Sequence, residues 1–190
     1  MEAILVSTGV VALAEMGDKT QLLAFILAAR FKRPLPIVLG IVFATLLNHG
    51  MAGALGTWIT TVISADVLRW VLGASFIGMA IWTLIPDKIE DEETQIVGKL
   101  GVFGATFITF FLAEMGDKTQ LATIALAAHY AAPVLVIAGT TMGMLIADVP
   151  AVFLGNKFAD KVPMRLVHMI AAAIFALMGA LTLVGIDKLF

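Results

Sequence analysis

The sequence predicts an all-α integral membrane protein with six transmembrane helices, arranged as two inverted three-helix repeats. Its composition is the first indication, because 61% of the 190 residues are hydrophobic and only 14% are charged. Soluble domains carry roughly 45–50% apolar and about 25% charged residues. The mean hydropathy of +1.02 also favours a lipid environment. The other two observations are six long apolar runs and an internal duplication.

Each apolar run approaches or exceeds the length of about 20 residues that crosses a hydrocarbon core. The runs lie at 3–29, 35–57, 66–85, 100–128, 133–155 and 165–186. The strongly polar stretch 86–99 separates the third run from the fourth and predicts an acidic cytosolic linker. The expected units are therefore a first repeat at 1–85, this linker, and a second repeat at 100–190.

The duplication covers the whole of each half. The segments 14–22 and 113–121 both read AEMGDKTQL, an offset of 99 residues, and the offset continues without a gap to Phe76 and Phe175. Because three helices is an odd number, the second copy enters the membrane from the opposite side. This predicts the inverted-repeat architecture of many secondary transporters, with a site near the bilayer midplane where the repeats meet.

The distribution of basic residues predicts the orientation, since cytosolic loops are enriched in lysine and arginine. With the N-terminus outside, the inner segments hold eight basic residues: Arg30, Lys32, Arg33, Lys88, Lys99, Lys157, Lys161 and Arg165. The outer segments hold only Arg69 and Lys188. We therefore expect a multi-pass protein with both termini on the non-cytosolic side.

The repeated motif places charged residues deep in the membrane. Glu15 lies about a dozen residues into the first run, and Glu114 lies at the same depth in the fourth. Ionisable groups at such depth cost roughly 2.5–3.5 kcal/mol each on insertion scales, so they usually mark functional sites. A continuous helix would place Glu15, Asp18 and Lys19 on one face. Gly17 and Gly116 also permit a local break that would expose backbone carbonyls.

These residues predict a cation site made from both motifs. The expected ligands are Glu15, Asp18, Thr20, Gln21, Glu114, Asp117, Thr119 and Gln120. Their oxygen atoms suit hard cations such as calcium, magnesium and manganese. The four carboxylates and the two charge-balancing lysines, Lys19 and Lys118, leave two negative charges, which one divalent cation or two protons would neutralise. Competition between metal and protons for the same oxygens is the physical basis of an antiporter.

Three further polar residues lie deep in the second and fifth runs. His49 and Asp148 occupy equivalent positions in the two repeats, and Asn48 precedes His49. Asp148 is a candidate additional ligand or proton carrier. Asn48 and His49 could support the ligands without contacting the cation, although polar side chains in membranes often serve only as hydrogen-bond partners between helices.

Several alternatives remain at this stage. Glu15 and Lys19 could form a purely structural ion pair, but this leaves Asp18 and Asp117 uncompensated. Paired acids could also hold a cationic amino acid, although the motif lysines disfavour it. A membrane-embedded enzyme is disfavoured because acid and base roles need distinct environments. A scaffold does not explain charges retained twice at depth. The isoelectric point of about 5.9 argues against nucleic acid as a partner.

The doubled motif Glu-Met-Gly-Asp-Lys-Thr resembles the signature of the GDT-type cation transporters, and the resemblance covers nearly the whole chain. It implies export of manganese, or alternatively calcium, from the cytosol in exchange for protons. The compact length resembles bacterial manganese exporters of the inner membrane. It also implies that Glu15, Asp18, Thr20 and their equivalents Glu114, Asp117 and Thr119 hold the cation. No catalytic residues and no resident cofactor are expected, and homo-oligomerisation is left open.

Overall fold

The computed structural model describes residues 1–85, 100–154 and 164–185. These residues form eight α-helices and no β-strand. The helices are α1 (Glu2–Glu15), α2 (Lys19–Phe31), α3 (Pro34–Val62), α4 (Ala65–Thr83), α5 (Gly101–Glu114), α6 (Lys118–Tyr130), α7 (Pro133–Leu154) and α9 (Met164–Val184). The predicted linker 86–99 lies outside the described residues.

The predicted first and fourth runs are not continuous helices. The first is divided into α1 and α2, and the fourth into α5 and α6, with each break inside the repeated motif. Gly17 and Gly116 have φ angles of 82° and 81° at these breaks. This left-handed conformation costs glycine little because it has no Cβ. The three motif residues therefore do not share one continuous helical face.

Among the described residues, three helices are long and apolar enough to cross a membrane: α3, α4 and the segment Pro133–Phe153 of α7. Two shorter apolar helical segments are Gly101–Glu114 and His168–Val184. Many large apolar side chains are exposed, including Trp58, Trp70 and Phe43, each more than half accessible. An exposed apolar surface on this scale is expected where lipid replaces water.

The helices that carry the motifs pack mainly against helices of the other half of the sequence. The short helix α1 lies along α7, and its counterpart α5 lies along α3. Glycines allow both approaches, because a Cβ at Gly139 would lie 2.9 Å from Ser7 Cβ and one at Gly40 would lie 2.7 Å from Thr106 Cβ. These two glycines and their two partners are related by the 99-residue offset.

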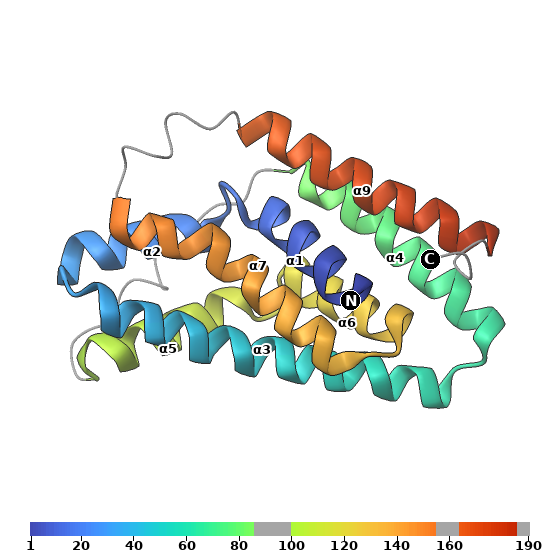
Figure 1. Ribbon diagram of the computed structural model, residues 1–190, viewed down its shortest axis with the longest axis horizontal. Helices are drawn as coiled ribbons and strands as arrows, with labels where there is room; N and C mark the ends of the chain where they lie inside the picture. The colour runs from blue at the N-terminus through green and yellow to red at the C-terminus, as the bar shows by residue number, and fades with distance from the viewer. Residues whose placement is uncertain (86–99, 155–163, 186–190) are drawn as a thin grey trace.

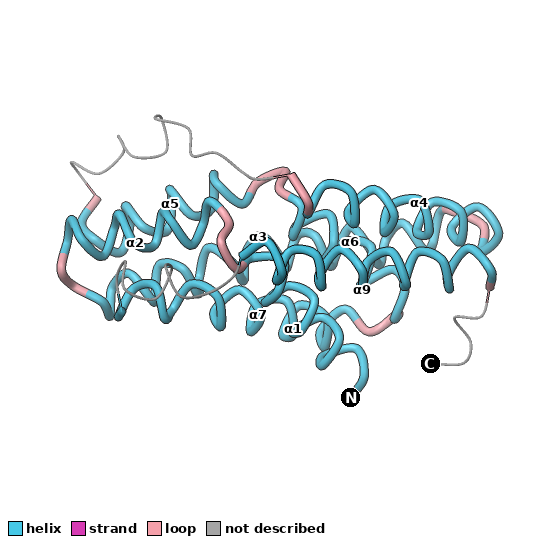
Figure 2. Tube along the Cα trace, turned by 90° about the horizontal axis from the view of Figure 1, so that it is seen from above, coloured by secondary structure: helices cyan, strands magenta, loops and turns pink. Residues whose placement is uncertain are grey.

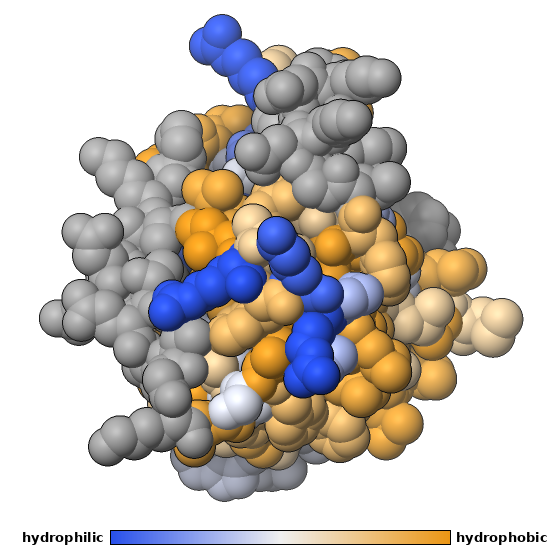
Figure 3. All heavy atoms as spheres, turned by 90° about the vertical axis from the view of Figure 1, so that its left-hand side faces the viewer, coloured by the Kyte–Doolittle hydropathy of each residue, from blue (hydrophilic) through white to orange (hydrophobic). Residues whose placement is uncertain are grey.

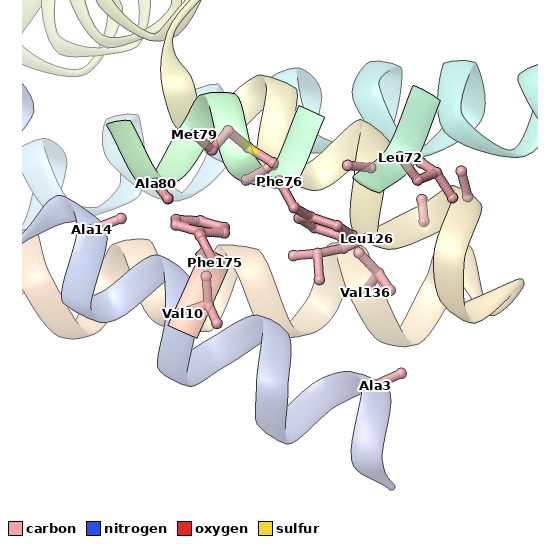
Figure 4. Close-up of a cluster of buried hydrophobic side chains, with 14 residues drawn as sticks. Ala3, Val10, Ala14, Leu72, Phe76, Met79, Ala80, Leu126, Val136 and Phe175 are labelled. Carbon is pink, nitrogen blue, oxygen red and sulfur yellow. The ribbon is translucent and has the colours of Figure 1, made fainter. Parts of the chain in front are cut away.

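The remaining helices α4 and α9 form an antiparallel pair at one end of the molecule (Figures 1 and 2). Phe76 of α4 and Phe175 of α9 stack with ring centroids 6.5 Å apart. Figure 4 shows them in a buried cluster with Val10 of α1 and Leu126 of α6. A second buried cluster joins α2, α3, α5 and α7 without α4 or α9.

The opposite end of the molecule holds α2, α5 and the turn between α2 and α3 (Figures 1 and 2). The basic residues Arg30, Lys32 and Arg33 at this turn are exposed. Figure 3, which faces this end, shows hydrophilic side chains projecting from a surface that is otherwise largely apolar.

Candidate cation site

The two helix breaks meet in the interior of the molecule. One carboxylate oxygen from each of Glu15, Glu114 and Asp117 lies within 4.8 Å of the other two. Glu15 is fully buried, while Glu114 and Asp117 are 1% and 4% exposed. The acidic cluster therefore draws on both motifs, although those motifs are 99 residues apart in the sequence.

The broken helices also direct their ends toward this region. Glu15 and Glu114 are the last residues of α1 and α5, where a helix has unpaired carbonyl groups and a partial negative charge. Asp18 and Asp117 are the N-cap residues of α2 and α6, where the partial charge is positive and stabilises a carboxylate. Lys19 N–H donates to Asp18 Oδ1 at 2.7 Å. The breaks thus place the glutamates and aspartates at helix ends of opposite polarity.

The lysines pair across the motifs. Lys118 Nζ lies 2.9 Å from Asp18 Oδ2, and Lys19 Nζ lies 3.8 Å from Asp117 Oδ1. The alternative of an ion pair between Glu15 and Lys19 finds no support, because this pair is not among the ion pairs of the described residues. Each motif therefore contributes the lysine that faces the aspartate of the other, and the two pairs link the halves of the chain.

The motif threonines contact the glutamates of their own motif. Thr20 Oγ1 donates to Glu15 Oε2 at 2.6 Å, and Thr119 Oγ1 donates to Glu114 Oε1. Both threonine side chains are buried. These hydrogen bonds fix one oxygen of each glutamate and leave its second oxygen available.

Three carboxylate oxygens in the cluster have no hydrogen-bond partner among the described residues. They are Glu15 Oε1, Glu114 Oε2 and Asp117 Oδ2, all buried. An unsatisfied buried carboxylate oxygen is costly and calls for a partner such as an ion or a proton. The arrangement can therefore bind a hard cation through oxygens from both motifs.

The motif glutamines tie each helix break to a neighbouring helix. Gln21 Oε1 accepts from Gly17 N–H at 3.0 Å, while its Nε2 donates to Ala147 O at 2.9 Å. In the second motif, Gln120 Oε1 accepts from Gly116 N–H at 2.8 Å. Both amide oxygens thus already act as acceptors, although the sequence suggested them as metal ligands.

The partner of Gln120 is a side chain. Its Nε2 lies 3.4 Å from Asn48 Oδ1, and Asn48 Nδ2 donates to Phe111 O at 3.1 Å. Asn48 on α3 and Ala147 on α7 are related by the 99-residue offset. The two motifs are therefore held at equivalent places but by different atoms.

Besides the different partners of the two glutamines, His49 and Asp148 make the surroundings of the two motifs unequal. Both are fully buried at equivalent positions on α3 and α7. His49 Nε2 lies 3.7 Å from Glu114 Oε1, beyond hydrogen-bond distance. Both nitrogens of His49 and both oxygens of Asp148 have no hydrogen-bond partner among the described residues. An imidazole thus lies beside one glutamate, and its counterpart in the other repeat is a carboxylate.

One contact to the motif region was not anticipated from the sequence. His168 Nε2 on α9 lies 2.6 Å from the backbone carbonyl oxygen of Met16, which follows Glu15. The sequence assigns His168 no role at the site. No sequence signal identifies it, because the acceptor is a backbone group that only the helix break makes available.

Comparison with known proteins relates these features to a family. Residues 3–91 and 102–188 match the family model described as "Divalent cation/proton antiporter GDT1". The chain is 50% identical over 183 residues to a Vibrio cholerae protein named "Putative manganese exporter", which covers 96% of this chain and 90% of that protein. It is 31% identical over 194 residues to GDT1-like protein sll0615 of Synechocystis, covering 90% and 92%.

A plant relative, GDT1-like protein 3 of Oryza sativa subsp. japonica, is 29% identical over 201 residues, covering 92% of this chain and 71% of its own. No solved structure matches the chain. The family match spans most of both halves and includes both motifs. The chain belongs to the GDT1 family of divalent cation/proton antiporters.

Proposed function

We propose that this antiporter exports manganese from the bacterial cytosol across the inner membrane in exchange for protons. The 50% identity to a protein named as a manganese exporter supports the choice of metal. Calcium remains the second candidate, because it binds through the same oxygen ligands. The family assignment gives no support to the cationic amino acid alternative.

The proposed architecture is six membrane crossings in two inverted repeats. In this arrangement α1 and α2 together form the first crossing, and α5 and α6 form the fourth. Gly139 lies close to Ser7, and Gly40 lies close to Thr106. These two pairs are equivalent under the 99-residue offset, which supports a symmetric packing of the two repeats. The basic turn between α2 and α3 is cytosolic in this proposal, so both termini lie on the other side of the membrane.

The observation that carries the proposal is the cluster of three unpartnered carboxylate oxygens drawn from both motifs. We assign Glu15, Glu114 and Asp117 as cation ligands, with Asp18 next to them and linked to Lys118. The hydroxyls of Thr20 and Thr119 orient the two glutamates. Gln21 and Gln120 are assigned to holding the helix breaks rather than to the metal.

Charge balance supports exchange for protons. The four motif carboxylates exceed the two motif lysines by two negative charges. One divalent cation neutralises this excess when it is bound, and two protons neutralise it when the cation has left. Asp148 adds a further buried carboxylate and, with His49, is a candidate for carrying protons to and from the cluster. Alternating access then exposes the same cluster to each side in turn.

The test is transport by the purified protein in liposomes. Manganese, calcium and magnesium are supplied separately, with and without a pH gradient, while metal and proton movements are recorded by fluorescent indicators. We expect manganese to move faster when the pH gradient drives protons in the opposite direction. We also expect that pH gradient to collapse as manganese moves. Manganese transport that is indifferent to the pH gradient would contradict the proton coupling.

Glutamine substitutions test the assigned ligands. Loss of one interaction with a charged group costs about 1.5–3 kcal/mol, so Glu15→Gln and Glu114→Gln should each reduce metal affinity by a factor of about 10 to 150. Glu2→Gln is the matched control, because Glu2 is an exposed glutamate on the same helix as Glu15. Equal transport by all three variants would refute the assignment.

A further inference from the structure

We propose that the α4–α9 pair moves from one side of the two helix breaks to the other, so that α9 exchanges α1 for α2 while α4 exchanges α6 for α5. His168 and Arg69 are positioning residues in this proposal: His168 holds the break of the first motif in one state, and Arg69 holds the break of the second motif in the other. This inference rests on the proposed inverted repeats and alternating access. It adds two residues outside the motifs and a specific second conformation. Its basis is the difference between contacts that occur at equivalent positions in both halves and contacts that occur in only one.

Most contacts around the site occur in both halves. Each motif glutamate accepts from its own threonine, each motif glycine donates to its own glutamine, and each motif lysine faces the aspartate of the other motif. The close approaches at glycines, where α1 packs against α7 and α5 packs against α3, also occur in both halves. This part of the molecule is therefore close to symmetric.

The pair α4 and α9 departs from this symmetry. Helix α9 packs against α1, and α4 packs against α6. Their counterparts under the offset would be α4 against α5 and α9 against α2, and the described residues show no comparable packing there. Accordingly, α4 and α9 contribute to the buried cluster shown in Figure 4 and not to the second one. The α4–α9 pair thus packs against α1 and α6 and, among the described residues, leaves the equivalent surface on α5 and α2 without such packing.

His168 makes a polar contact in the interface between α9 and the end of α1. Its Nε2 lies 2.6 Å from Met16 O, and because a carbonyl only accepts, Nε2 carries the hydrogen. Met16 is the C-cap residue of α1 and follows Glu15 directly. A donor at this carbonyl satisfies one of the unpaired groups at the end of α1 and fixes the backbone that carries Glu15.

The equivalent contact, between Arg69 and the carbonyl of Met115, is not among the hydrogen bonds of the described residues. Position 69 is equivalent to 168, and position 115 to 16. Arg69 lies on α4, and its buried Nε has no hydrogen-bond partner among the described residues. Met115, the C-cap residue of α5, is 55% exposed. The contact between His168 and Met16 is formed, whereas its equivalent consists of an Arg69 nitrogen without a hydrogen-bond partner in the described part of the chain and an exposed helix end at Met115.

Exchanging the roles of the repeats gives the second state. In it, α4 packs against α5, α9 packs against α2, and the guanidinium of Arg69 donates to Met115 O. The end of α5, with Glu114, is then the one held, and the end of α1 is released. The stacked pair Phe76 and Phe175 is related to itself by the offset, so it can persist in both states.

Cysteine cross-linking can detect this second state, and the chain contains no native cysteine. We compare the pair Met16→Cys/His168→Cys with the pair Arg69→Cys/Met115→Cys, using a flexible thiol cross-linker of about 10 Å reach in membrane vesicles. Manganese and pH gradients of either sign shift the population. We expect the first pair to react most under one gradient and the second pair under the reverse gradient.

Failure of the second pair to cross-link under every gradient, in protein whose parent transports manganese, would overturn the exchange while leaving the proposed function intact. Absence of transport by the cysteine-free parent would instead refute the proposed function. Met16→Cys/Arg69→Cys serves as the matched control pair, because neither state brings these positions together.

Substitutions test the two positioning residues. His168→Leu removes the donor, whereas His168→Gln retains an N–H near the position of Nε2. Loss of one hydrogen bond should alter the equilibrium between the states about 10-fold. We therefore expect His168→Leu to raise the KM for manganese at one membrane face, Arg69→Leu to raise it at the opposite face, and His168→Gln to restore the value.

Leu166→Ala is the control, because Leu166 is an exposed residue of α9 near His168. It should leave both KM values unchanged. A general weakening of the fold would lower the maximal rate for both leucine variants without separating the two faces. If His168→Leu and Arg69→Leu changed KM equally at the same membrane face, the proposal that these residues act in different states would be refuted.

Discussion

The first and second motifs have the same nine residues but different surroundings. Within each motif the helix break, the threonine contact and the glutamine contact to glycine are the same. Around the first motif, Gln21 reaches a backbone carbonyl and His168 holds Met16. Around the second, Gln120 reaches Asn48, and His49 lies beside Glu114. Local sequence thus determines the shape of each motif, while the neighbouring helices make the two unequal.

The largest expected difference between the motifs is between their lysines. Lys118 is buried and lies 2.9 Å from Asp18, while Lys19 is 18% exposed and lies 3.8 Å from Asp117. Breaking a buried pair costs about 3–5 kcal/mol, so Lys118→Met should destabilise the protein by that amount and Lys19→Met by clearly less. Thermal unfolding in detergent measures both. The double variant Lys118→Met/Asp18→Asn should recover part of the loss, and no recovery would contradict the pairing.

The second comparison concerns the glycines that seat the two motif helices. A Cβ at Gly139 would lie 2.7 Å from Ile4 O, and one at Gly40 would lie 3.1 Å from Phe103 O. Overpacking of this kind costs typically about 1–3 kcal/mol, so both alanine variants should unfold earlier. Gly78→Ala is the control, since nothing lies within 4 Å of a Cβ there. A loss for only one of the two seating glycines would show that the two interfaces are not equivalent.

The third comparison tests the helix break itself. Gly116 has space for a Cβ but a φ of 81°, so Gly116→Ala introduces only backbone strain. A left-handed alanine costs about 1–2 kcal/mol, and we expect that loss in stability together with weaker metal binding. Gly9→Ala, in the middle of α1 with open space around it, should be neutral or stabilising. Unchanged binding by Gly116→Ala would show that the break does not position Glu114.

The smallest effect is expected from the glutamines. Gln21 donates to a backbone carbonyl at 2.9 Å, whereas Gln120 lies 3.4 Å from a side-chain oxygen that can move with it. Loss of one such bond costs about 0.5–1.5 kcal/mol, so Gln21→Ala should weaken manganese binding more than Gln120→Ala. Binding titrations at equal protein concentration measure the difference. If Gln120→Ala and Asn48→Ala have fully additive effects, the contact between those side chains contributes nothing.

Much of this arrangement follows from the sequence. The duplication predicted which residues are equivalent, and the charged motifs predicted that acidic residues from both halves would meet, as Glu15, Glu114 and Asp117 do. Gly17 and Gly116 permitted the helix break, and that break is present. The sequence could not predict the exchange of lysines, because the 15–19 spacing suggests a pair only within a continuous helix. Once Gly17 turns the chain, Lys19 faces a residue from the other motif, and only tertiary packing determines which one.

The reciprocal ion pairs have an evolutionary consequence. Each half of the chain carries both the lysine and the aspartate that the other half requires. In the proposed inverted arrangement, a single half could therefore complete the same cluster with a second copy of itself. Fusion of the two copies into one chain adds something that a symmetric pair of identical subunits lacks. It allows one position to become His49 while its counterpart becomes Asp148, so that the surroundings of the cluster differ between its two halves.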